Sequence, residues 1–127
     1  VGDAVLASGQ KWTGAQRGDT FALTSATTIT IDLDEANNYS VTLAHNATFA
    51  NPSISSDQVG QSGSIFITQD GTGSRTAVSP WGSYWKFASG TAPTLSTDAA
   101  YVDRIDYIVA STTAIHAVAT IGLALTS

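Results

Sequence analysis

Apolar and polar residues alternate along much of this chain. The large apolar side chains take every second position in residues 27–33 and 39–44, and similar alternation recurs in 64–68, 104–109 and 115–125. Successive side chains of a β-strand point to opposite faces of the sheet, so a period of two predicts half-buried strands. The pattern therefore predicts a protein built from β-sheets.

Turn residues divide the chain into short segments. The sequence Asp70-Gly71-Thr72-Gly73 is the strongest turn signal and predicts a hairpin between residues 63–69 and 75–78. The polar residues 33–38 predict a second hairpin, between 27–33 and 39–44. We expect about nine or ten short strands with turns every 8–12 residues, a spacing typical of sandwiches and barrels. The predicted fold is therefore all-β, either an antiparallel β-sandwich of the jelly-roll kind or a barrel.

Two segments leave alternatives open. Residues 97–109 have a possible helical stripe of apolar side chains, although strands at 102–110 and 114–125 fit the alternation better. Residues 1–19 contain four glycines and form either an extended arm that docks on a neighbour or a loop with an edge strand. A chain of 127 residues has the length of one domain. We expect a single β-sandwich domain over 20–127, preceded by the segment 1–19.

The composition excludes several classes of function. The chain has 15 Ser and 18 Thr but only 12% charged residues, so its surface is rich in hydroxyl groups. Its net charge is −5 and its five basic residues are scattered, which argues against binding to nucleic acid. Without cysteine it forms neither disulfides nor thiolate metal sites. The apolar residues 108–125 alternate and contain His116, which argues against a membrane span.

The ionisable residues form no convincing catalytic set. Asp32 and Asp34 would share one face of a strand, with Glu35 beside them, but the spacing departs from a calcium-binding EF-hand loop, and a solvated strand end explains them. His116 is expected on a solvent or subunit face; it would form a metal site only if copies of it met on the axis of a trimer, and a lone histidine is weak evidence for that. The chain contains no Gly-x-Ser-x-Gly nucleophile motif. We therefore predict neither an enzyme nor a bound cofactor.

Aromatic residues gather between positions 81 and 87. Trp81, beside a proline in a predicted turn, and Tyr84 are candidates for an exposed platform on which sugar rings stack. Trp85 and Phe87 would share the opposite face of a short strand and are expected in the core. Near the N-terminus, Trp12 is expected to anchor its segment by burying its indole ring. A core or subunit interface is the alternative environment for all of these rings.

Several segments between residues 10 and 118, mostly turn motifs, form a recognisable set. They are Gln10-Lys11-Trp12-Thr13, Gln16-Arg17-Gly18, residues 38–43, Asn51-Pro52, residues 60–73, Gly82-Ser83-Tyr84-Trp85-Lys86-Phe87, residues 90–97 and Asp103-Arg104-Ile105-Asp106-Tyr107. Together they resemble a module of tailed-phage virion proteins, often found at the end of chains of the tail-fibre kind.

The resemblance implies a β-rich, oligomeric virion component without enzymatic activity. A short chain with an arm-like start favours a homotrimeric decoration or cement protein, assembled into the virion in the host cytoplasm and bound to the major capsid protein or other virion proteins. The alternative is a module of a tail fibre or head spike that binds a cell-surface glycan or receptor through Trp81 and Tyr84. Trp12 and His116 are the remaining candidates for contacts with partners.

Overall fold

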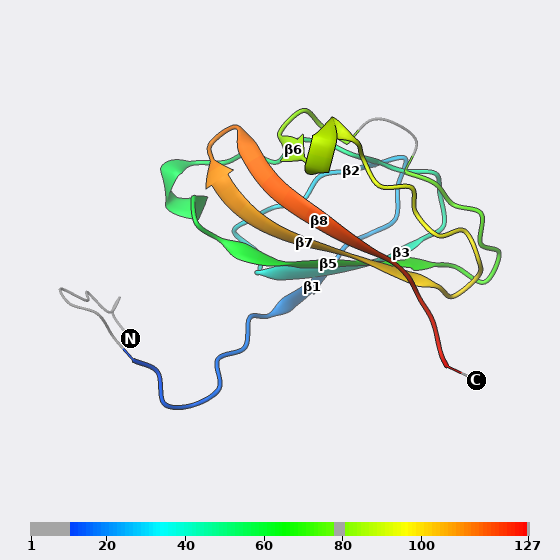
Figure 1. Cartoon of the computed structure of the whole chain (residues 1–127), viewed down its shortest axis with the longest axis horizontal. Helices are drawn as coiled ribbons and strands as arrows, with labels where there is room; N and C mark the ends of the chain where they lie inside the picture. Colours follow the sequence, from blue (N-terminus) through cyan, green and yellow to red (C-terminus); the bar gives the residue numbers. More distant parts are fainter. Residues whose placement is uncertain (1–10, 78–80, 127) are drawn as a thin grey trace.

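Eight strands form two sheets in residues 11–77 and 81–126, which this computed structural model describes. The larger sheet has the order β1-β3-β5-β7-β8-β6, and β2 and β4 form a small second sheet (Figure 1). The prediction of an all-β fold is confirmed. The elements are β1 (Thr20–Ala22), β2 (Thr28–Ile29), β3 (Asn38–Leu43), β4 (Thr48–Phe49), β5 (Ser62–Gln69), β6 (Trp85–Lys86), β7 (Val102–Ser111), β8 (Ala114–Leu123) and two short 3-10 turns, η1 (Ser56–Gln58) and η2 (Ala88–Gly90).

In the first half of the chain, successive strands alternate between the large sheet and the small sheet, which forms a second layer. Strands β1, β3 and β5 are parallel neighbours in the large sheet, and β2 and β4 are parallel neighbours in the small one. An isolated parallel bridge between Ala47 and Ala77 continues the second layer. Parallel strands require a crossover connection, and here the segments 23–37 and 44–61 provide it. The large sheet is therefore mixed, and the prediction of a purely antiparallel arrangement is wrong.

Both predicted hairpins in this half are also wrong, for the same reason. Residues 27–33 pair with β4 through β2 and not with β3, because the chain has crossed to the other layer. After β5, the Asp70 carboxylate accepts hydrogen bonds from the backbone N–H groups of Thr72 and Gly73, so the predicted turn forms. The chain then leaves the large sheet and reaches the second layer at Ala77. The predicted strand ends at Val78, which lies outside the described residues.

The second half contains one long antiparallel hairpin, β7–β8. Its register places Tyr107 opposite Ala117 and Val109 opposite Ile115, and β7 also pairs antiparallel with β5. The predicted strands at 102–110 and 114–125 are thus confirmed, and the helical alternative for 97–109 is excluded from Val102 onward. The strong alternation of β7, in which Asp103, Ile105, Tyr107 and Val109 are buried, explains why a strand forms here.

The core lies between one face of the large sheet and the segments that cross over it. The same alternation that predicted strands places the buried side chains of β3, β5, β7 and β8 on this inner face. Residues of the small sheet and the long loops cover them. The main inner-face residues are Tyr39, Val41, Leu43, Ile65, Ile67, Ile105, Tyr107, Val109 and Ile115, and the covering residues are Ile29, Ile31, Leu33, Phe49, Trp81, Trp85 and Leu95.

Residues 11–19 form an extended segment that leads away from the sheet (Figure 1). Every residue in it is exposed. Its hydrogen bonds to the domain come at its end, where the Asn38 side-chain amide donates to the Gly18 carbonyl at 3.3 Å and the Asn38 backbone N–H donates to the Asp19 carbonyl at 3.1 Å. Residues 1–10, which belong to the same predicted arm, lie outside the described residues.

Candidate functional site

The face of the large sheet turned away from the core exposes several large apolar side chains. Three large apolar side chains of this outer face are well exposed: Phe66 at 36%, Ile108 at 48% and Val118 at 68%. Strand register places Phe66 beside Arg104, Val118 beside Asp106, and Ile108 beside His116. We define the outer face by these six residues, which come from β5, β7 and β8.

The two charged residues of the outer face neutralise each other. Arg104 Nε lies 3.0 Å from Asp106 Oδ1, and the Ser64 hydroxyl donates a hydrogen bond of 2.6 Å to the same carboxylate. The strand alternation explains the pairing, because residues two apart on β7 share a face. A paired and hydrogen-bonded carboxylate is less costly to cover than an isolated one. The outer face thus presents apolar side chains without an unpaired acidic group at its centre.

A shallow hollow of about 600 Å³ lies on this face beside β6. The Lys86 ammonium group at its edge donates a hydrogen bond of 2.6 Å to the Ser83 carbonyl, which holds the charge at the turn before β6. The strand pairing of β6 with β8 places Lys86 next to His116. The rest of the lining is largely apolar, so the hollow suits an apolar or aromatic group. Its side chains come mainly from Lys86, Phe87, Ala88, Ile108, His116 and Val118.

Of the four residues singled out in the sequence, His116 and Trp12 are exposed, although Trp12 was expected to bury its indole ring. His116 is exposed on the outer face, as its position in the alternation predicted. Trp12 is 67% exposed in the extended N-terminal segment. An anchoring role for its indole ring therefore requires a surface beyond its own segment.

Trp81 does not form an exposed platform, and this prediction is wrong. Its side chain is only 6% exposed, because β4 places the Phe49 ring against it with centroids 4.4 Å apart and planes at 12°. Trp85 and Phe87 meet the indole edge-on, at 5.2 Å and 5.1 Å. The prediction that Trp85 belongs to the core is confirmed, and Phe87 packs against the core while partly buried.

Tyr84 is half-buried in the turn that leads to β6. Its backbone N–H donates to the Asn51 side-chain oxygen at 2.8 Å, and its carbonyl accepts from the Ile115 N–H at 2.8 Å. These bonds hold the residue's backbone between the second layer and β8. Because Trp81 beside it is buried, Tyr84 has no exposed tryptophan partner in this turn.

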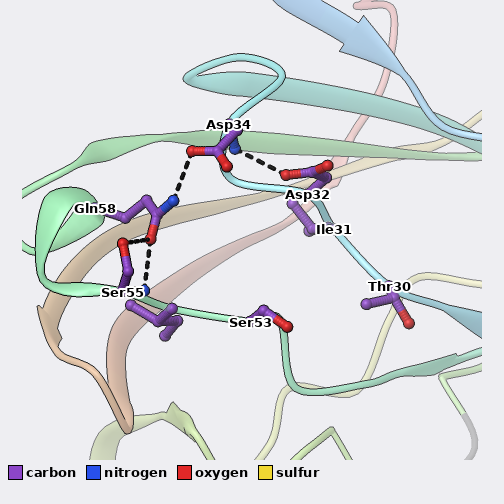
Figure 2. A pocket seen from close by; sticks show the side chains of 8 residues that line it. Thr30, Ile31, Asp32, Asp34, Ser53, Ser55 and Gln58 are labelled. Carbon is purple, nitrogen blue, oxygen red and sulfur yellow. Dashed lines mark hydrogen bonds between the residues drawn. The ribbon is translucent and has the colours of Figure 1, made fainter.

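A second, polar pocket of about 550 Å³ contains two of the three clustered acidic residues (Figure 2). The Asp34 backbone N–H donates to Asp32 Oδ1 at 3.0 Å, and the Gln58 amide donates to Asp34 Oδ1 at 2.6 Å. Gln58 in turn accepts from the backbone N–H of Ser55, which caps η1. Asp34 thus has a partner within the chain, and Glu35 does not line the pocket. The lining residues are Thr30, Ile31, Asp32, Asp34, Ser53, Ile54, Ser55 and Gln58.

Two absences bear on the predicted chemistry. Within 11–77 and 81–126, no three His, Asp or Glu side chains are grouped in a way that could hold a metal ion. In the same part of the chain, no helix has the length and apolar character needed to cross a membrane.

The ionisable groups with a shifted pKa take part in hydrogen bonds that connect loops to the sheet. Burial, reinforced by the nearby Tyr107 hydroxyl, raises the pKa of Tyr39 to about 12. Burial also raises the pKa of Tyr107. The Arg75 guanidinium, 2.9 Å away, lowers the pKa of Asp70, with help from the N–H groups of the turn.

The sequence analysis did not single out Phe66, Ile108 or Val118, although a signal was present. In Ile65-Phe66-Ile67 the middle residue is apolar at a position that the alternation assigns to solvent, and Ile108 and Val118 are apolar at equivalent positions. An apolar residue on the polar face of a strand is informative when several fall on adjacent strands. That adjacency became visible only with the strand order.

Comparisons with protein-family models, with curated proteins and with solved structures gave no match. The description of the site therefore depends on its own residues and geometry.

Proposed function

We propose that this protein is a non-enzymatic structural component of a phage virion, which decorates the capsid as a symmetric oligomer and reinforces contacts between capsid subunits. The outer face carries this proposal, because it exposes Phe66, Ile108 and Val118 on one surface of a sheet. Exposed large apolar side chains grouped on one face, with the Arg104–Asp106 pair between them neutralised, suit a protein–protein contact. The placement in a virion rests on the resemblance of the turn motifs and of the segments between them.

The length of the central strands favours association through the face of the large sheet. The edge strands β1 and β6 contain three and two residues, and β6 pairs with β8 only at Ile115 and His116. The central strands β7 and β8 contain ten residues each and present the outer face along their length. We therefore assign the contact between copies, in a homotrimer, to side chains of this face.

A sandwich architecture is part of the proposal. Ile29 of β2 and Phe49 of β4 belong to the same core as the inner face of the large sheet, so the small sheet lies over that face. On this interpretation the crossing segments form the second layer of an irregular sandwich. Such a rigid two-layer body suits a protein whose task is to hold neighbours together.

The proposal is tested on particles. We expect the chain to be detected by mass spectrometry in purified virions that encode it, and cryo-electron microscopy to show it as an oligomer on the shell. Ile108→Ser should reduce its occupancy on the shell at least tenfold while the circular dichroism spectrum is unchanged. Val59→Ser is the matched control, because Val59 is similarly exposed at 43% but follows η1, away from the outer face. Virions that lack the chain, or full occupancy by the Ile108→Ser variant, would overturn the proposal.

Binding of a cell-surface glycan is the second candidate function, and the polar pocket of Figure 2 favours it. Carboxylate, hydroxyl and amide groups of Asp32, Ser53 and Gln58 line that pocket, and such groups bind sugar hydroxyls. A glycan array probed with the wild-type protein and with Asp32→Asn separates the two functions. A decoration protein binds nothing on the array, whereas a receptor-binding module gives a signal that Asp32→Asn lowers.

A further inference from the structure

We infer that the extended segment 11–17 of one copy docks on the outer face of a neighbouring copy, with Trp12 in the hollow beside β6. This inference rests on the proposed oligomer and names the segment and the surface that hold it together. Two features of the chain, far apart in sequence, fit each other: an exposed indole on a projecting segment and an apolar hollow on the sheet.

The projecting segment has the properties of a docking arm. Trp12 is 67% exposed, more than either of the other two tryptophans, which are both 6% exposed in the core. Burial of an aromatic side chain on a partner removes 150–250 Å² from water, roughly, and aromatic anchors dominate many protein interfaces. Trp12 is exposed on a segment that leads away from its own domain, so burial of its indole ring on a partner is strongly favourable.

The hollow provides the matching surface. It is shallow, open to solvent and largely apolar, so it offers a surface against which the face of an indole ring can pack. Ile108 and Val118 supply apolar contacts, and His116 and the Lys86 stem supply the rim. The charged groups of the lining have partners within the chain: the Lys86 ammonium is bonded to the Ser83 carbonyl, and the Asp106 carboxylate is paired with Arg104.

Charge also favours the contact. Residues 11–18 contain Lys11 and Arg17 and no acidic residue, so this segment has a net charge of +2. Residues 20–127 contain eight acidic and three basic residues, a net charge of −5. A basic arm is therefore attracted to the acidic body of another copy, which increases the rate at which the two meet.

The positions of arm and hollow imply a head-to-tail contact. The arm leaves the sheet at the edge strand β1, and the hollow lies at the opposite edge, beside β8 and β6. A contact between two different surfaces of identical chains closes into a ring when the rotation between them allows it. The seven residue-to-residue steps from Trp12 to Asp19 span roughly 23 Å when extended, enough to pass from one copy onto the next.

Cysteine cross-linking tests the inference directly, because the chain contains no cysteine of its own. Thr13→Cys in the arm and His116→Cys in the hollow are prepared as separate proteins, mixed in equal amounts and oxidised. We expect a disulfide-linked heterodimer in at least tenfold higher yield than with Ser53→Cys in place of His116→Cys. Ser53 is exposed and lines the polar pocket, so it is the matched control.

Self-association gives a second readout. We expect Trp12→Ala to raise the dissociation constant of the oligomer at least tenfold in analytical ultracentrifugation, and Trp12→Phe to retain most of the affinity. Equal cross-linking yields for His116→Cys and Ser53→Cys would overturn the inference, and so would an unchanged dissociation constant in Trp12→Ala. If either result came with full occupancy of virions, the arm would be excluded and the proposed function would stand. Specific cross-linking by a chain that is absent from virions would support the arm and exclude the proposed function.

Discussion

At the scale of single residues, two buried polar side chains connect the long loops to the end of the sheet. Gln69 and Asp103 are 2% and 1% exposed. The Gln69 amide donates to the carbonyls of Arg75 and Ser96, and the Asp103 carboxylate accepts from the N–H groups of Ser96 and Gly122. Buried polar groups stabilise a fold only when they are fully hydrogen-bonded, as these are. Both residues continue the inward-facing alternation of β5 and β7, but the sequence analysis did not single them out as buried, because their partners are distant in sequence.

Replacing Asp103 by asparagine should destabilise the protein strongly. One oxygen of this carboxylate lies 2.8 Å from the Ser96 N–H, and the other lies 2.8 Å from the Gly122 N–H and 2.7 Å from the Ser96 hydroxyl. An amide NH₂ group at either position faces a donor and leaves buried groups unpaired. We expect a loss of about 2–3 kcal/mol in the free energy of unfolding, measured by urea denaturation.

Asp106→Asn is the control, because Asp106 lies three positions along the same strand with its side chain 43% exposed. Its exposed ion pair contributes at most about 1 kcal/mol. Equal destabilisation by the two variants would show that the Asp103 network does not hold the loops.

At the scale of elements, alternation predicted which segments form strands but not which strands pair. The bounds of β3, β5, β7 and β8 agree with the predicted segments to within one or two residues. In residues 27–33 the predicted inward residues Ile29, Ile31 and Leu33 are indeed buried, although only Thr28–Ile29 pairs as a strand. Alternation reports burial on one face, and it contains no information on the pairing partner.

The aromatic residues illustrate the same limit. A tryptophan beside a proline in a turn was predicted to be exposed, and Trp81 is buried because the crossing segment of β4 brings Phe49 against it. That contact joins residues more than thirty positions apart, so no local pattern encodes it. The sequence analysis did not predict the outer face either, because its apolar residues become neighbours only through the strand order.

A glycine on β5 fixes how closely the preceding crossover approaches the sheet. A Cβ atom at Gly63 would collide with the backbone carbonyl of Asn37 in the segment that leads into β3. We expect Gly63→Ala to cost about 1–3 kcal/mol in the free energy of unfolding, because backbone on one side must move.

Gly71→Ala is the matched control for this position. A Cβ atom at Gly71 has no neighbour within 4 Å, so the change should alter stability by roughly 0.5 kcal/mol or less. Thermal and urea unfolding of both variants measure this difference in stability. A Gly63→Ala variant as stable as Gly71→Ala would contradict the close approach of the Asn37 backbone to Gly63.

At the scale of the whole molecule, two buried tyrosines connect the sheet to the loop before β3. The Tyr39 hydroxyl lies 2.6 Å from the Asp32 carbonyl and 2.7 Å from the Ala36 carbonyl, and the Tyr107 hydroxyl donates to the Asn37 carbonyl at 2.6 Å. Each hydroxyl needs its proton to make these bonds. The fold is therefore coupled to the protonation of both rings.

This coupling predicts a loss of stability in alkaline solution. Burial raises the pKa of Tyr39 from 10.0 to about 12, so between these values the folded chain keeps a proton that the unfolded chain releases. The stabilisation is complete below pH 10.0 and is lost as the pH rises toward about 12. We expect the free energy of unfolding, measured in urea across this range, to fall more steeply for the wild type than for Tyr39→Phe. Parallel slopes would contradict a coupled Tyr39.

The order of the strands has a consequence for synthesis of the chain on the ribosome. Strands β1 to β5 are synthesised before β7 and β8, so β5 at first has one partner, β3, and an open edge of eight residues. That edge is covered only when β7 has been made, and β7 is stabilised by β8, which follows it in the chain. An unpaired edge of this length readily joins strands of other chains. Translation that stops between Gln69 and Val102 would therefore release an aggregation-prone fragment, and completion of the C-terminal hairpin ends that hazard.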